Sequence, residues 1–363
     1  MHVRNNAIQG LRGLGAITVF IWHIDWLVNS FFKISPTCLF RGDFANPMFF
    51  MIAGFFVGLL YDYKSFNTKK YIFKRIESIY PLYFLTVITA LLYKFFDYGF
   101  TFEWVNWSYA MECMPHFLLL QSWIPYYDQE FLLNGPAWFL STMLFFWVLT
   151  KPMLKLVNHC HYTKKSIIIS GTIMIFTIGT YVIDRYNLIK TIPEIIRPYN
   201  YCPYFLGIVI GYSAEEDELF YNKNNNYVKD FTFLVGLFVL ILLRNILNRV
   251  LSFTLLIPYL MTLILYIYKN EDSYLGRVLS NPALVSIGNV SLEFYLIHIP
   301  ILGLFYRLQP YMSEHLGNLE LVIISFICTW LFAKAIVSMK SKCNTLKKLK
   351  EKKYNENSGI NPY

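Results

Sequence analysis

The sequence predicts an all-α integral membrane protein, a bundle of about ten transmembrane helices with no appended soluble domain. Of the 363 residues, 56% are hydrophobic and 19% aromatic, and the mean hydropathy is +0.41, values that a soluble domain of this length does not need. Apolar runs long enough to cross a bilayer recur along the chain. Most of the 32 lysines and arginines fall in the short segments between these runs. This is the pattern of a polytopic membrane protein.

The apolar runs define the expected spans, because roughly 18 or more apolar residues cross the hydrocarbon core. A stretch at 102–123 is interrupted by Glu103, Glu112 and Pro115, and we expect it to be a loop packed on the outer rim. The sixth run is short and only a tight turn separates the seventh from the eighth, so nine or eleven spans are alternatives. The ten expected helices lie at 8–30, 44–61, 79–96, 136–156, 166–183, 200–213, 231–247, 251–268, 286–306 and 319–338.

The distribution of basic residues sets the orientation. With the N-terminus inside, the inner segments hold 22 of the 32 lysines and arginines and the outer segments 9. We expect a multi-pass protein of the plasma (inner) membrane with both termini cytoplasmic. Residues 1–340 would form the transmembrane domain, and 341–363 a basic, disordered cytoplasmic tail near anionic headgroups.

Charge and cysteine content exclude other classes. The net charge of +9 follows from membrane topology, so the expected partner is the lipid bilayer and not nucleic acid. The six cysteines show no CxxC spacing, and neither a metal site nor a disulfide framework is expected. The oligomeric state does not follow from the sequence.

The first span carries ionisable residues that hydrocarbon disfavours. Eleven helical steps of about 100° place Arg12 and His23 on one face, about 16 Å apart. Ionisable groups inside a span are costly and by default line a polar path or site. The alternatives are that Arg12 extends to the lipid headgroups and that His23 is a satisfied core histidine.

The spacing of Arg12 and His23 resembles that of the first helix of the membrane acyltransferase-3 family, which has Arg, ten residues and then His. Two motifs in the next spans resemble further motifs of this family. Residues 49–55 are similar to the family's Phe-Phe-x-x-Ser-Gly-Phe, with Ala53 in place of the serine. Residues 75–81 are similar to Arg-x-x-Arg-Ile-Tyr-Pro, with Arg75 at the first arginine and Ser78 at the second.

The most specific resemblance is a pair of motifs at 118–123 and 134–143. They are similar to Leu-Leu-x-Gln-Ser-Trp and to Asn-x-x-x-Trp-x-Leu-Ser-x-Glu. Trp138 matches the family tryptophan, which could also be an ordinary aromatic-belt residue. Met143 stands where many members carry glutamate, so another residue must supply that carboxylate or none does.

Two later stretches extend the resemblance. Gly207 and Gly211 fit the glycine pattern of the sixth helix and are expected to serve packing. Residues 288–300 are similar to Gly-x-x-Ser-x-x-x-Tyr-Leu-x-His-x-Pro. His298 should reach the depth of His23, which suggests a shared polar cavity, with structural pairing as the alternative. Glu293 should face the bundle and be hydrogen-bonded or protonated.

The resemblance implies an acyltransferase-3-like membrane domain over residues 1–340. Its expected activity is that of an O-acyltransferase, most commonly an O-acetyltransferase, which uses cytosolic acetyl-CoA or another acyl-CoA as donor and no metal. The expected acceptor is a hydroxyl of an extracytoplasmic polysaccharide or glycolipid. The alternatives are a transporter or flippase for a lipid-linked sugar, and a catalytically inactive family member in envelope assembly.

Residue roles follow from this chemistry. Arg12 and Arg75 would bind coenzyme phosphates, because the planar guanidinium donates two parallel bonds to phosphate. His23 would be the general base or an acyl carrier. Asp43 would orient its imidazole, since the short first outer loop keeps this carboxylate near the first helix. Asp25 lies about 200° around the helix from His23 and cannot easily reach that ring, and Glu130 lies in another outer loop. The remaining candidates are His298 for catalysis and Asn46, Trp138 and Tyr295 for the substrate site.

Overall fold

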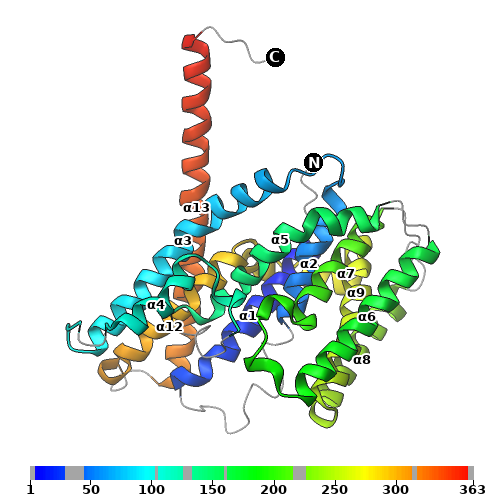
Figure 1. Ribbon diagram of the computed structural model, residues 1–363, viewed down its shortest axis with the longest axis horizontal. Helices are drawn as coiled ribbons and strands as arrows, with labels where there is room; N and C mark the ends of the chain where they lie inside the picture. Colours follow the sequence, from blue (N-terminus) through cyan, green and yellow to red (C-terminus); the bar gives the residue numbers. More distant parts are fainter. Residues whose placement is uncertain are drawn as a thin grey trace.

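The computed structural model describes residues 5–28, 45–102, 105–125, 133–158, 162–215, 226–312 and 317–358. In these ranges the chain is helical and contains no strand (Figure 1). The α-helices are α1 (Asn6–Val28), α2 (Ala45–Leu60), α3 (Thr68–Asp97), α4 (Trp107–Phe117), α5 (Trp138–Val157), α6 (Tyr162–Arg185), α7 (Pro198–Tyr212), α8 (Asn226–Ile246), α9 (Arg249–Lys269), α10 (Tyr274–Leu279), α11 (Pro282–Asn289), α12 (Ser291–Met312) and α13 (Asn318–Ser358).

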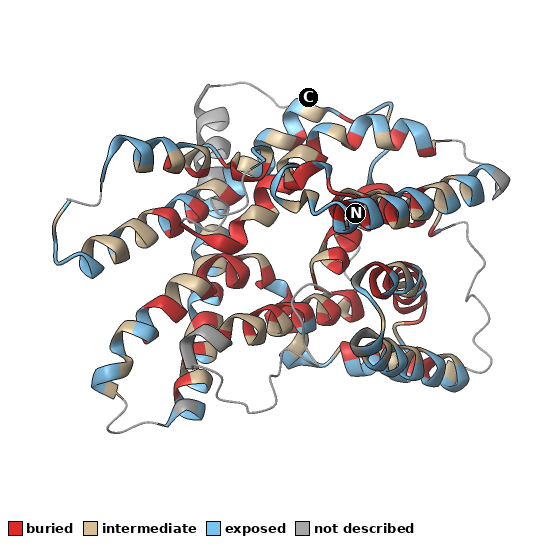
Figure 2. Ribbon diagram, turned by 60° about the horizontal axis from the view of Figure 1, so that its bottom comes forward, coloured by how far each residue is buried: buried red, intermediate tan, exposed pale blue. Residues whose placement is uncertain are grey.

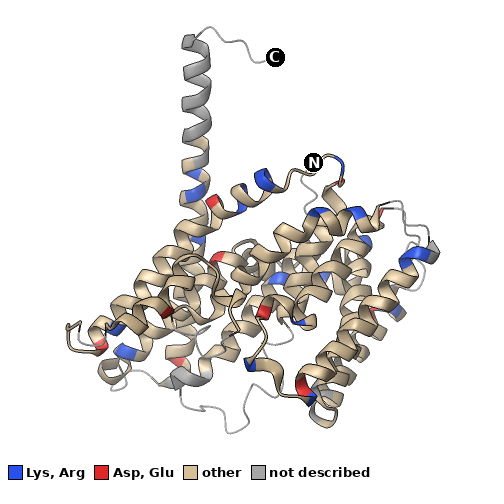
Figure 3. Cartoon of the chain, in the orientation of Figure 1, with Lys and Arg blue, Asp and Glu red and all other residues tan. Residues whose placement is uncertain are grey.

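Each predicted apolar run is helical, but fewer helices than predicted have the length of a span. Within the described ranges, seven helices are long and apolar enough to cross a membrane, or eight if the bent pair α11–α12 counts as one. Helices α2 and α7 have 16 and 15 residues, fewer than the roughly 20 that a helix normally needs. Charged residues are sparse along the helices (Figure 3). The architecture is that of a multi-pass membrane protein, while the count of ten spans stays a prediction.

The ninth predicted span, 286–306, is wrong as a single helix. The chain forms α11 and α12, which meet at an angle of 78° at Val290. The break follows from packing: a Cβ atom at Gly288 would overlap the backbone of α1. Helix α11 therefore lies directly on α1, and α12 leaves in another direction to cross the bundle.

Two local predictions are also corrected, both because asparagine caps are present. The stretch 102–123 contains the helix α4, whose first turn is capped by Asn106, which accepts a hydrogen bond from the backbone N–H of Tyr109 at 2.8 Å. Helix α3 begins at Thr68 and not at residue 79, because Asn67 caps it in the same way. Arg75 is thereby held on a helix.

At the other end of the chain, α13 continues past residue 340 to Ser358 and crosses the predicted domain boundary.

Helices α2 and α7 pack backbone to backbone. A Cβ atom on any of four glycines would overlap a backbone carbonyl oxygen of the other helix: Gly54 and Gly58 on α2, and Gly207 and Gly211 on α7. Small residues at such an interface let backbones approach without lipid between them. The predicted packing role of Gly207 and Gly211 is confirmed. The buried residues gather where the helices meet at the centre of the bundle (Figure 2).

Candidate active site

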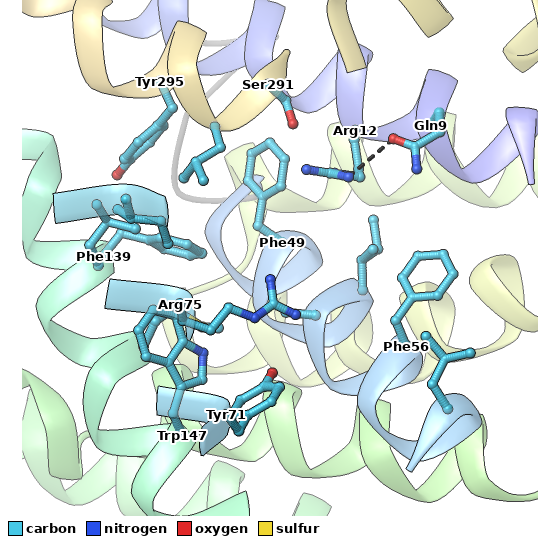
Figure 4. Close-up of a pocket in the computed structure, with 17 residues that line it drawn as sticks. Gln9, Arg12, Phe49, Phe56, Tyr71, Arg75, Phe139, Trp147, Ser291 and Tyr295 are labelled. Atoms are coloured by element: carbon cyan, nitrogen blue, oxygen red, sulfur yellow. Dashed lines mark hydrogen bonds between the residues drawn. The ribbon is translucent and has the colours of Figure 1, made fainter. Parts of the chain in front are cut away.

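A cavity of about 380 Å³ lies among α1, α2, α3, α5 and α12. Arg12 of α1 and Arg75 of α3 point into it from different walls (Figure 4). Neighbours one turn earlier hold both side chains: Arg12 Nη1 donates to Gln9 Oε1 at 3.1 Å, and the Arg75 guanidinium lies 5.1 Å from the centre of the Tyr71 ring. We call this space the arginine cavity.

The charge of the arginine cavity is positive and its walls are largely apolar. The ion pairs in the described part of the chain involve neither arginine. Two guanidinium groups that form no ion pair with a described carboxylate favour a bound anion, and their shape suits phosphate. Ala53 and Met143, which stand where the family pattern has serine and glutamate, both line this cavity. The remaining lining residues are Phe49, Ile52, Phe56, Leu60, Ile79, Phe139, Leu140, Trp147, Ser291, Leu292 and Tyr295.

His23 and His298 are in direct contact. Their ring centres are 5.0 Å apart, and His23 Nδ1 lies 3.3 Å from His298 Nε2. His23 Nδ1 also lies 2.8 Å from the carbonyl oxygen of Val19, and His298 Nδ1 lies 2.6 Å from that of Tyr295. The sequence predicts a common depth for these two residues and a shared polar cavity or a structural pairing, but not their direct contact.

The hydrogen-bond partners assign the tautomers of the neutral rings. A carbonyl oxygen can only accept, so Nδ1 carries the proton in both histidines. His298 Nε2 is then an acceptor, and the N–H at His23 Nδ1 is shared between it and the Val19 carbonyl. His23 Nε2 keeps its lone pair. Among the described residues no group donates to this nitrogen, and the other nitrogen of the ring contacts Val19 and His298.

A small apolar cluster contacts both the arginine cavity and the histidine pair. Val19, Ala45 and Tyr295 form it, and the rings of Phe49 and Phe139 pack against it. Tyr295 belongs to both regions, since it lines the cavity and precedes His298 by one helical turn. Cavity and histidine pair therefore follow one another along α1 and α12.

The other predicted site residues are distributed differently. Asp43 and Glu130 lie outside the described residues. Asn46 is half-buried in the first turn of α2, and Trp138 contacts Phe50, with ring centres 6.3 Å apart. Neither lines the arginine cavity as the described residues define it. No group of three or more His, Cys, Asp or Glu side chains in the described ranges could hold a metal ion.

The most specific pair of motifs has a structural role that the sequence does not reveal. Ser122 Oγ donates to the carbonyl oxygen of Trp138 at 2.9 Å, and Trp123 Nε1 donates to that of Ser141 at 3.1 Å. These bonds fasten the 3₁₀ turn η3 (Gln121–Trp123) to the start of α5.

Two buried charges are paired. Lys340 Nζ lies 2.9 Å from Glu293 Oε1, which confirms the expectation that this carboxyl is hydrogen-bonded. Arg197 is 1% exposed; it pairs with Glu194 and donates to the carbonyl oxygens of Ile189 and Ile192. Arg197 thus holds the segment that leads into α7, a role that its place in an outer loop did not suggest.

Comparisons with known proteins agree with one another. A family model described as an acyltransferase domain matches residues 5–335. The chain is also similar to ORF330 of Acidianus two-tailed virus, whose name proposes an acetyltransferase: the two are 24% identical over 305 residues, which is 80% of this chain and 82% of the viral protein. No solved structure matches significantly.

Proposed function

This chain belongs to the acyltransferase-3 family of enzymes that transfer acyl groups, and from this premise we propose that it moves an acyl group from acyl-CoA to a glycan hydroxyl. One observation supports the proposal: a cavity with two guanidinium groups that form no ion pair within the described residues adjoins, along α1 and α12, a pair of histidines in which no described residue donates to His23 Nε2. The arrangement separates an anion-binding end from a proton-accepting end.

The arginine cavity is the proposed donor site. Arg12 and Arg75 would bind the phosphates of the coenzyme, and the apolar walls suit the rest of its arm and the acyl group. Acetyl is the proposed acyl group. When bound, the donor supplies the thioester carbonyl that is attacked.

His23 Nε2 is the proposed general base. It takes the proton of the acceptor hydroxyl as the hydroxyl oxygen attacks the acyl carbon, and it returns that proton to the sulfur as the C–S bond breaks. Val19 and His298 hold the ring through Nδ1 during the transfer. The products are an ester and a free thiol. One imidazole is sufficient, because the proton that it takes from the hydroxyl is the proton that it gives to the sulfur.

An acyl carrier role uses the same nitrogen. In that variant His23 Nε2 attacks the donor first and passes the acyl group to the acceptor in a second step. Incubation with radiolabelled acetyl-CoA and no acceptor separates the two routes. Label on the protein that His23→Ala abolishes supports the carrier, and its absence together with active transfer supports the base.

The proposed location is the plasma membrane, with both termini and the arginine cavity on the cytoplasmic side. The donor then enters from the cytosol, and the acceptor, a surface polysaccharide or glycolipid, comes from the other side. The apolar cluster around Tyr295 lies between the two entrances.

The test is release of free thiol by the purified protein in nanodiscs, with acetyl-CoA and a glycan acceptor. Arg12→Lys and Arg75→Lys should each raise the KM for acetyl-CoA, because an ammonium does not reproduce the guanidinium fork. Arg185→Lys, at the exposed end of α6, is the matched control and should leave it unchanged. An unchanged KM for acetyl-CoA in both Arg12→Lys and Arg75→Lys would contradict the assignment of the arginine cavity as the donor site. Absence of thiol release with every acceptor tried contradicts acyl transfer and favours a transporter or an inactive family member.

A further inference from the structure

Three aromatic rings from three helices line one part of the arginine cavity. They belong to Phe49 of α2, Phe139 of α5 and Tyr295 of α12. Figure 4 shows Phe139 and Tyr295 on the opposite side of the cavity from Phe56. The same three rings take part in the apolar cluster that contains Val19. We call these three residues the aromatic layer.

The aromatic layer continues into the histidine pair. The centre of the Tyr295 ring lies 5.6 Å from that of Phe139 and 5.7 Å from that of His298. His298 in turn contacts His23, with ring centres 5.0 Å apart. Neither histidine is among the described residues that line the arginine cavity. An acyl group that moves from the cavity to His23 along this line of rings meets the aromatic layer on the way.

The rings of the aromatic layer have little space to move aside. Phe139 stacks on Phe50, with ring centres 4.3 Å apart and planes at 19°, and Phe50 is fully buried. The Tyr295 hydroxyl donates to a backbone carbonyl oxygen in the turn before α5, at 2.6 Å. Phe49 lies over Gly15 of α1, where a Cβ atom would already meet the ring at 3.0 Å. Rings packed in this way resist displacement, because a protein interior has few voids to receive them.

We propose that the aromatic layer, through Phe139 in particular, sets the size of the acyl group that the protein transfers and restricts it to acetyl. The inference rests on the proposed function, in which Arg12 and Arg75 hold the coenzyme phosphates and the thioester reaches toward His23. The methyl group of an acetyl donor then lies against the aromatic layer. Each further methylene would overlap a fixed ring, and overpacking of a close-packed site is unfavourable.

The test compares acetyl-CoA, butyryl-CoA and hexanoyl-CoA as donors for one preparation of the protein in nanodiscs, with thiol release as the readout. The ratio of kcat/KM for hexanoyl-CoA to that for acetyl-CoA does not depend on how much of the protein is folded. Phe139→Ala should raise this ratio at least about tenfold over wild type, the scale on which methylene groups are distinguished in an apolar pocket. Phe139→Leu, a milder change, should raise the corresponding ratio for butyryl-CoA by a smaller factor.

Phe56→Ala is the matched control. It removes a phenyl ring from the same cavity, about two helical turns from Phe49 along α2 and on the side away from Tyr295. Its ratio of hexanoyl to acetyl transfer should equal that of wild type, whatever the change does to donor affinity. A second readout needs no acceptor: relative to acetyl-CoA, hexanoyl-CoA should raise the Tm of Phe139→Ala more than that of wild type.

Each outcome decides the assignment. A wild type that uses hexanoyl-CoA as readily as acetyl-CoA overturns it, and so does a ratio that both Phe139 variants leave unchanged or that Phe56→Ala raises equally. If no acyl-CoA raises the Tm of wild type, the proposed donor site is contradicted and this inference with it. If the Tm values show the expected dependence on chain length but no thiol is released, only the proposed transfer reaction is contradicted.

Discussion

At the scale of single residues, the side chain that pairs with His23 within the described residues is a second imidazole, His298. In the described part of the chain, the group that accepts from His23 Nδ1 besides the Val19 carbonyl is His298 Nε2. A neutral imidazole fixes tautomer and orientation as an aspartate does, but it adds no negative charge to stabilise the imidazolium. If His23 is the base, this pairing contributes orientation of the ring and no charge.

Loss of the His23 ring tests its role. His23→Ala should lower acyl transfer by about 10²–10⁴-fold, the usual cost of removing a general base, with the protein still folded and inserted. Leu14→Ala, an exposed position on the same helix, is the control and should retain activity. Activity above about a tenth of wild type in His23→Ala contradicts the assignment.

The contact between the two histidines makes a sharper prediction about His298. In His298→Gln, Oε1 can occupy the place of Nε2 and accept from His23 Nδ1, so most of the activity should remain. His298→Asn carries its polar atoms only at the level of Nδ1, and turnover should fall about tenfold or more with the KM for acetyl-CoA unchanged. Equal losses in both variants would indicate that the ring serves packing alone.

The predicted role of Asp43 can be measured beside that of His298. If a carboxylate also assists His23, Asp43→Asn should reduce turnover more than Asp25→Asn or Glu130→Gln, with little effect on donor affinity. If all three variants turn over at near-wild-type rates and His298→Asn loses activity, then His298 and none of these carboxylates orients His23.

At the scale of elements, the glycine contact between α2 and α7 sets the wall that carries Ala53. Gly54→Ala should lower the free energy of unfolding by about 1–3 kcal/mol, because the new methyl group meets the backbone of α7. Gly171→Ala on α6 is the matched control: a Cβ atom there meets open space, and helix propensity should make the variant neutral or up to about 1 kcal/mol more stable. The measurement is thermal unfolding in nanodiscs, and equal Tm values for the two variants would contradict the packing argument.

The sequence predicts the elements better than their junctions. Arg12 and His23 fall on one face of α1 because helical periodicity is local, and the apolar runs mark the long helices for the same reason. The break at Val290 depends on the packing of α11 on α1, and the early start of α3 depends on a cap in a polar segment. Hydropathy detects neither of these. The direct contact of His23 with His298, from helices distant in sequence, likewise depends on how α1 and α12 pack.

At the scale of the whole molecule, segments predicted for the same membrane side lie together. Near the predicted inner side, Glu271 accepts from the backbone N–H of Asn6, and Lys340 pairs with Glu293. Near the predicted outer side, Asp97 pairs with Arg307. The helices thus alternate in direction as a multi-pass chain requires, and the basic residues then choose which end faces the cytosol.

Orientation is testable with cysteines placed at the two ends. In a variant whose native cysteines are replaced except for the exposed Cys343, a membrane-impermeant maleimide should label intact cells only after permeabilisation. A second variant carries Phe102→Cys as its single cysteine, at an exposed position beyond the end of α3, and should be labelled without permeabilisation. The physical reason is that Lys and Arg are retained on the cytoplasmic side, which would place the arginine cavity on the side of the proposed acyl-CoA donor. The reverse labelling pattern would put Arg12 and Arg75 on the outer side, out of reach of a cytosolic donor, and would contradict the proposed direction of transfer.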